Sequence, residues 1–272
     1  LFFAELLQKI SHPITAYHEP DVFPFQGRSL IQRLGQYLDK PGAWDLFAGK
    51  LIGNKNLIQI SDNRYKRKLD FPAAVRRLAH CRGQFITRQQ GKLYFEADVG
   101  YYGLIDVLEG VFSNHRTAYF IRDGRSWVTS HLNWGEMYQK NSIRQLLFHT
   151  WPTAQEWSEE IHLDDWREAS VFEKLCWAWV NLNAYALKTL EANPNARLFY
   201  FEDIFESSSG YQNLAACLDF LLAPREKFRV SSLEIEGVLE RKVHISRGDF
   251  SSWKQWSSEQ KQVFEIMCSD FM

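Results

Sequence analysis

The stretch Thr117-Ala-Tyr-Phe-Ile-Arg-Asp-Gly-Arg-Ser-Trp-Val-Thr-Ser-His131 decides the fold class that the sequence predicts. Residues 117–121 are apolar, aromatic or β-branched and predict a buried strand, and Gly124 to Leu132 predicts a helix directly after it. Arg122 therefore stands at the carboxyl end of a strand, where open α/β sheets collect their ligands.

The residues at this strand end suit an anion. An arginine fork, a hydroxyl from the following helix and the unpaired N–H groups at the start of that helix can together hold a phosphate. The alternative is that Arg122 pairs with Asp123 or with another neighbouring carboxylate.

Short apolar segments alternate with helical patterns over the rest of the chain. Strands are predicted near residues 14–18, 93–97, 117–121 and 197–201, and helices near 1–10, 27–38, 102–112, 171–191 and 211–222. This alternation predicts an α/β fold of three layers, in which helices flank both faces of a parallel sheet. The absence of repeats and of low-complexity linkers predicts a single domain over residues 1–272. Because Leu1 lies inside a helical pattern and is not a methionine, we expect a truncation just before it.

Composition limits the function classes. The chain has 272 residues, 45% of them hydrophobic, and a formal net charge of −1, so no global field favours nucleic acid or a membrane surface as partner. The four cysteines are far apart, the histidines lack metal-ligand spacing, and no apolar run is long enough to span a bilayer. These features predict no metal and no membrane span. They favour a cytoplasmic location, with a signal or anchor upstream of Leu1 and the oligomeric state left open.

Three segments resemble sulfotransferases that use 3′-phosphoadenosine-5′-phosphosulfate (PAPS). Arg122-Asp-Gly-Arg-Ser-Trp-Val-Thr-Ser130 is similar to the motif in which an arginine and a serine hold the 3′-phosphate of the nucleotide. Leu198-Phe-Tyr-Phe-Glu-Asp-Ile204 resembles the family's Tyr-Glu-Asp strand, with Phe201 where many relatives have tyrosine. The segment from His244 to Lys254 resembles the C-terminal part that closes over the same phosphate.

The resemblance implies a fold like that of P-loop nucleoside triphosphate hydrolases and a specific set of ligands. Arg122, Ser130, Arg247 and Gly248 would bind PAPS. Its sulfuryl group would pass to a hydroxyl or amine of a small-molecule, lipid or carbohydrate acceptor, leaving adenosine 3′,5′-bisphosphate. The family's loop for the 5′-phosphosulfate, of the type Arg-Ser-Gly-Thr, does not occur in the sequence. Residues 1–7 resemble the helix that follows it, so we expect the loop just upstream.

The acceptor's proton needs a base. Bacterial carbohydrate sulfotransferases use a glutamate at a similar strand end, and Glu19 is the predicted base, with His18 second. The alternative is that Glu19 orients an arginine and His18 caps a strand. Glu96 and Asp98, after another predicted strand, could line the acceptor side instead.

The sequence leaves two other functions open. The missing loop favours a degenerate sulfotransferase-like module that binds a nucleotide or serves as a scaffold. A P-loop phosphotransferase would need a glycine-rich loop with Lys-Ser/Thr and a Mg²⁺-binding aspartate, and the sequence shows neither.

Overall fold

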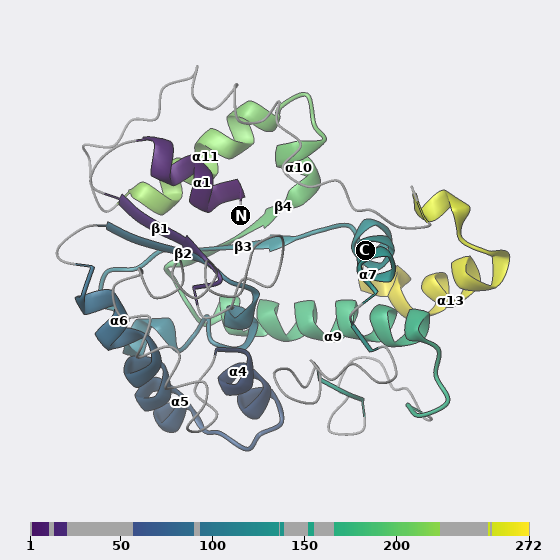
Figure 1. Ribbon diagram of the computed structural model, residues 1–272, viewed down its shortest axis with the longest axis horizontal. Helices are drawn as coiled ribbons and strands as arrows, with labels where there is room; N and C mark the ends of the chain where they lie inside the picture. The colour runs from purple at the N-terminus through teal and green to yellow at the C-terminus, as the bar shows by residue number, and fades with distance from the viewer. Residues whose placement is uncertain are drawn as a thin grey trace, which may run out of the picture. The chain divides into compact units, whose positions relative to one another are not determined.

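Figure 1 shows the computed structural model of the chain. The structure describes residues 2–10, 14–20, 57–89, 93–135, 137–138, 152–154, 166–223, 250 and 252–271. The chain divides into two compact units, Leu1–His115 with Arg229–Val243, and Arg116–Phe228 with His244–Met272. The single domain expected from the sequence stays a prediction.

The first unit contains a pair of parallel strands. Strand β1 (Ile14–His18) pairs with β2 (Leu93–Ala97) in a register that sets His18 opposite Ala97. Helix α1 (Phe2–Ile10) packs against both strands. Because the strands are parallel, their carboxyl ends meet at one edge, and the polar residues that follow them come together there.

Helices occupy most of residues 57–89, which belong to a basic segment (43–90) for which the sequence pattern predicts no element because charges interrupt its apolar periodicity. The described elements are α4 (Leu57–Tyr65), α5 (Phe71–Leu78), a π-helical turn (Ala79–Gly83) and α6 (Gln84–Thr87). The Asp70 carboxylate caps α5 by accepting the backbone N–H of Ala73 at 2.8 Å. Apolar residues of α4 and α5 share one buried core cluster with Leu104 and Val107.

The helix expected over residues 102–112 is wrong. Two short 3₁₀ segments, Val99–Gly103 and Leu108–Gly110, lie there with a turn between them. Gly100 approaches Leu57 so closely that a Cβ would lie 2.7 Å from the leucine Cβ. The glycines of this segment disfavour a continuous α-helix, and the close packing of Gly100 on α4 requires a residue without a side chain.

The second unit contains the other parallel pair. Strand β3 (Thr117–Ile121) pairs with β4 (Ala196–Tyr200), and Ile121 lies opposite Tyr200. The α-helices of this unit are α7 (Gly124–Trp134), α9 (Val171–Glu191), α10 (Phe201–Phe205), α11 (Gly210–Leu222) and α13 (Ser258–Cys268). The buried helix α9 packs against α7 and α13 and supplies much of the core of this unit.

The α/β class and the parallel pairing of the strands are confirmed, and the predicted strands at 14–18, 93–97 and 117–121 have the predicted bounds. The described strands form two separate two-stranded sheets. The strand expected at 197–201 ends one residue earlier, because Phe201 begins α10.

Among the described helices, none combines the length and the apolar character that crossing a membrane requires.

Candidate functional site

Arg122 follows β3 directly, as the sequence predicts. Its guanidinium carbon lies 5.0 Å from the centre of the Phe201 ring. Its Nε is buried and has no hydrogen-bond partner among the residues that the structure describes. Buried donors are almost always paired, so a bound water, ion or anionic ligand would complete this N–H.

The backbone beside Arg122 is held by two side chains. The carbonyl oxygen of Arg122 accepts a hydrogen bond from Trp179 Nε1 at 3.0 Å. The backbone N–H of Asp123 donates to Glu202 Oε1 at 2.9 Å.

Asp123 fills the start of helix α7. Its carboxylate accepts the backbone N–H groups of Arg125 at 2.8 Å and Ser126 at 3.4 Å, and it pairs with the Arg125 guanidinium, which lies 4.9 Å from the Trp253 ring. Burial alone would raise the pKa of Asp123, but the bonds and charge of Arg125 outweigh it and lower that pKa. The expectation that this helix start offers open N–H groups to an anion is therefore wrong. Arg125, and not Arg122, is the partner of Asp123.

Ser130 and His131 lie further along α7. Ser130 is half-buried, on the same helix that Arg122 precedes, and Arg247 and Gly248 lie outside the described residues. The His131 ring stacks on Trp127 with ring centres 3.8 Å apart, and its Nδ1 lies 2.9 Å from the Trp127 carbonyl oxygen.

Burial, together with a smaller effect of the positive charge of Arg122, lowers the pKa of His131 to about 4, against the opposing effect of the Trp127 carbonyl. Sequence reasoning assigned no role to His131, although it directly follows Ser130 in the quoted motif. A neutral imidazole therefore lies within the electrostatic reach of Arg122.

We expect His131 to make this protein less stable in acid. The pKa of His131 is about 4 in the folded state and about 6.5 in the unfolded state. Between these pH values the imidazole is protonated in the unfolded state and neutral in the folded state. The free energy of unfolding should fall as the pH drops through this window, by at most about 3 kcal/mol from this group. Urea denaturation of the wild type and of His131→Gln at several pH values checks this. Parallel stability curves for the two proteins would contradict it.

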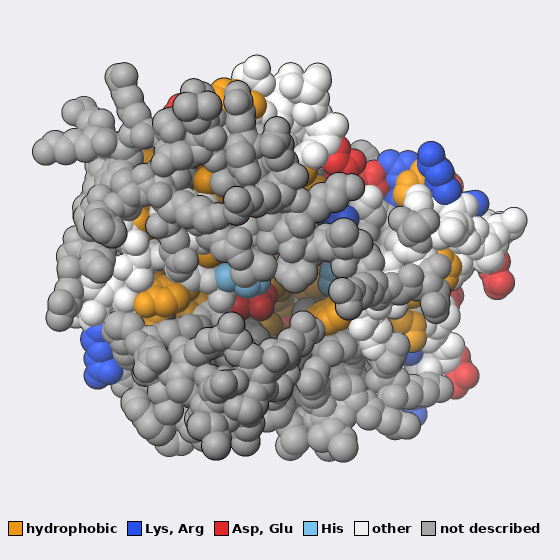
Figure 2. Space-filling model, turned by 45° about the horizontal axis from the view of Figure 1, so that its top comes forward, with side chains coloured by type: hydrophobic (Ala, Val, Ile, Leu, Met, Phe, Trp, Pro, Cys, Tyr) orange, Lys and Arg blue, Asp and Glu red, His pale blue; other side chains and the backbone are white. Residues whose placement is uncertain are grey.

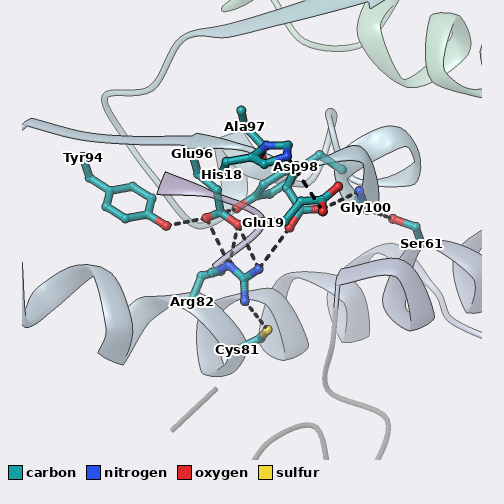
Figure 3. Close-up of polar contacts among 11 residues, drawn as sticks. His18, Glu19, Ser61, Cys81, Arg82, Tyr94, Glu96, Ala97, Asp98 and Gly100 are labelled. Carbon is teal, nitrogen blue, oxygen red and sulfur yellow. Dashed lines mark hydrogen bonds and ion pairs between the residues drawn. The ribbon is translucent and has the colours of Figure 1, made fainter. Parts of the chain in front are cut away.

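The second group of predicted residues lies in the first unit, at the carboxyl ends of β1 and β2 (Figure 3). The backbone N–H of Glu19 donates to the Ala97 carbonyl at 3.0 Å, which extends the pairing of the strands by one residue. Glu19 has a φ of 42°, a left-handed conformation that is uncommon for residues other than glycine. Strained backbone of this kind clusters at functional sites.

His18 and Glu19 are the accessible members of this group. Their side chains are 39% and 28% exposed, and His18 Nε2 lies 4.0 Å from Glu19 Oε2. His18 Nδ1 lies 3.2 Å from the Ala97 carbonyl oxygen. A carbonyl oxygen only accepts, so Nδ1 is the donor in this contact. Figure 2 shows histidine and acidic side chains beside each other on one face of the molecule.

Arg82 organises the buried part of the group. It is fully buried, and its Nε and Nη2 donate to the two oxygens of Glu96 at 2.9 to 3.1 Å. Its Nη2 also lies 3.7 Å from Asp98 Oδ2. Figure 3 shows this guanidinium facing the carboxylates at the strand ends.

Glu96 is fully committed to this network. Besides Arg82, it accepts the hydroxyls of Tyr94 at 2.5 Å and of Tyr101 at 3.0 Å. Burial, and after it the Glu96 charge, raises the pKa of Tyr94 and of Tyr101 far above the usual value, so both hydroxyls keep their protons and donate. Glu96 therefore acts as a structural carboxylate.

Asp98 is also engaged in local structure, because its Oδ1 accepts the backbone N–H of Gly100 at 2.7 Å. Among these acidic and histidine side chains at the strand ends, those of Glu19 and His18 are the more exposed. Arg82 could not be found from the sequence, because no pattern marks an arginine that tertiary packing buries. Over the described part of the chain, no three His, Cys, Asp or Glu side chains are arranged to hold a metal ion.

Comparisons of the chain with family models, with curated proteins and with solved structures found no match. The function therefore rests on the motifs and on the geometry of these two strand ends.

Proposed function

We propose that this chain binds a nucleotide bearing a 3′-phosphate at Arg122 and transfers the sulfuryl group of PAPS to a hydroxyl or amine. One observation carries the proposal: the Nε of Arg122, at the end of a parallel strand, is buried and lacks a partner among the described residues. A phosphate oxygen would satisfy it with a charge-assisted hydrogen bond. The proposal includes the three-layer, P-loop-like fold and a cytoplasmic location.

The surroundings of Arg122 fit a phosphate in further respects. No carboxylate among the described residues neutralises the guanidinium, since Asp123 is paired with Arg125 and Glu202 accepts a backbone N–H. The Phe201 ring supports the guanidinium plane. The Ser130 hydroxyl is the second phosphate ligand in this proposal, and Arg247 and Gly248 complete it from outside the described residues.

Bound PAPS supplies the sulfuryl group. The acceptor oxygen or nitrogen forms a bond to sulfur, the bond from sulfur to the 5′-phosphate oxygen breaks, and Glu19 takes the acceptor's proton. The products are the sulfated acceptor and adenosine 3′,5′-bisphosphate. The accessible carboxylate of Glu19 is suited to this step, whereas Glu96 is not, because its oxygens already accept five donated bonds.

Arg122→Ala should weaken the binding of adenosine 3′,5′-bisphosphate by about 30-fold, since it removes charge-assisted bonds to the 3′-phosphate. Isothermal titration calorimetry measures this directly. Arg197→Ala is the matched control, because Arg197 also lies over an aromatic ring, that of Phe220 at 4.6 Å, but near the start of β4. Equal affinities of the wild type and of Arg122→Ala would remove the nucleotide site from this strand end.

A further inference from the structure

The peptide unit between Arg122 and Asp123 is held at both of its polar groups. Trp179, from α9, binds its carbonyl oxygen at 3.0 Å, and Glu202, from α10, binds its N–H at 2.9 Å. A peptide unit is planar, so two bonds at its opposite edges fix the orientation of the whole plane. The direction in which Arg122 leaves the backbone is thereby fixed as well.

The pairing of β3 with β4 explains why these groups meet. Because Ile121 lies opposite Tyr200, the next residues, Arg122 and Phe201, leave the two strands side by side. Phe201 then places its ring 5.0 Å from the Arg122 guanidinium carbon. Glu202, one residue later, reaches the backbone N–H of Asp123. Two consecutive residues of α10 therefore hold the side chain and the backbone of the Arg122 segment.

Gly124 makes room for the other contact. A Cβ on Gly124 would lie 2.9 Å from three atoms of the Trp179 indole, closer than real contacts allow. Trp179 is itself buried in the core of the second unit, so it has little room to move away. The absence of a side chain at position 124 thus lets the indole approach the Arg122 carbonyl oxygen.

We infer that Glu202 and Trp179 are positioning residues, which aim the Arg122 guanidinium at the anion while touching only the backbone beside it. This inference rests on the proposed function for the identity of that anion. Glu202 acts here as a hydrogen-bond acceptor, so an amide oxygen at the same place can replace its carboxylate oxygen.

The test compares Glu202→Ala, which removes the acceptor, with Glu202→Gln, which keeps one. In calorimetry with adenosine 3′,5′-bisphosphate, we expect Glu202→Ala to bind about 10-fold more weakly and Glu202→Gln to stay within about threefold of the wild type. Glu206→Gln is the matched control, because Glu206 is an exposed carboxylate that follows the same helix. Hydrogen exchange of the Asp123 amide, followed by NMR, should be fast in Glu202→Ala and slow in Glu202→Gln.

A second variant tests the same inference from the other side of the peptide. Because the indole has little room to move, Gly124→Ala should push the Arg122 carbonyl oxygen away from Trp179 Nε1 and weaken binding of the same nucleotide to a similar extent. This variant leaves Glu202 in place, so it tests the inference independently of Glu202→Ala.

The outcomes separate this inference from the proposed function. Unchanged affinity in Glu202→Ala and Gly124→Ala, or a Glu202→Gln variant as weak as Glu202→Ala, would overturn the positioning role. A wild type that binds no adenosine 3′,5′-bisphosphate would overturn the proposed function. The exchange of the Asp123 amide would then decide the positioning role alone: faster exchange in Glu202→Ala with rescue in Glu202→Gln supports it, and equal exchange rates overturn it.

Discussion

Glu19→Gln should lower the turnover of labelled PAPS with an acceptor about 10³-fold, within the usual range for loss of a general base. Glutamine keeps the size of the side chain but cannot take the acceptor's proton. Because Glu19 does not belong to the proposed phosphate site, the affinity for adenosine 3′,5′-bisphosphate should change less than about twofold, well below the effect of one lost hydrogen bond. Transfer of radiolabelled sulfate and calorimetry on the same samples give the two values.

Glu109→Gln is a suitable control for this experiment, since Glu109 is an exposed carboxylate elsewhere in the same unit. Normal turnover in Glu19→Gln would exclude Glu19 as the base and direct attention to His18. Because the Nδ1 of His18 contacts the Ala97 carbonyl oxygen, its Nε2 is the ring nitrogen that could take the acceptor's proton.

Arg82→Met should lower the free energy of unfolding by about 3 to 5 kcal/mol, the usual result of removing one partner from a buried ion pair. The side chain of Glu96 is only 3% exposed, so without Arg82 its charge would have neither water nor a cation beside it. Urea denaturation followed by tryptophan fluorescence measures the loss.

The double variant Arg82→Met with Glu96→Gln should recover more than half of this loss. It removes the buried charge, and the glutamine oxygen still accepts the hydroxyls of Tyr94 and Tyr101, which remain protonated. A loss below about 1 kcal/mol for Arg82→Met alone would mean that the pair is no stronger than an exposed one.

Local signals predicted much of the fold. Helix α9 has the predicted bounds because a capping box of Ser170 and Glu173 begins it and Asn193-Pro194 follows its end. The strands were predictable because each is a short apolar run. Helices α4 and α5, within residues 57–89, could not be predicted from local patterns, because their apolar residues pack against Leu104 and Val107, which lie further along the chain.

The site was predictable only where a local motif marks it. The position of Arg122 at the end of β3 followed from strand and helix patterns. An aspartate directly before a helix is also a local signal for a capping residue. The sequence was equally compatible with a pairing of Asp123 to Arg122, whereas in the structure Asp123 caps α7 and pairs with Arg125. The burial of Arg82 against Glu96 joins a helical turn to a strand through tertiary packing, which no spacing in the sequence reveals.

At the proposed phosphate site, the Asp123 carboxylate at the start of α7 leaves the Arg122 guanidinium as the charged group that would recognise the ligand. Asp123 already balances the partial positive charge of the helix, so a ligand gains little there from negative charge alone. Discrimination then depends on the flat, forked geometry of the arginine, which matches two oxygens of a tetrahedral group. A lysine at position 122 would keep the charge and lose that match.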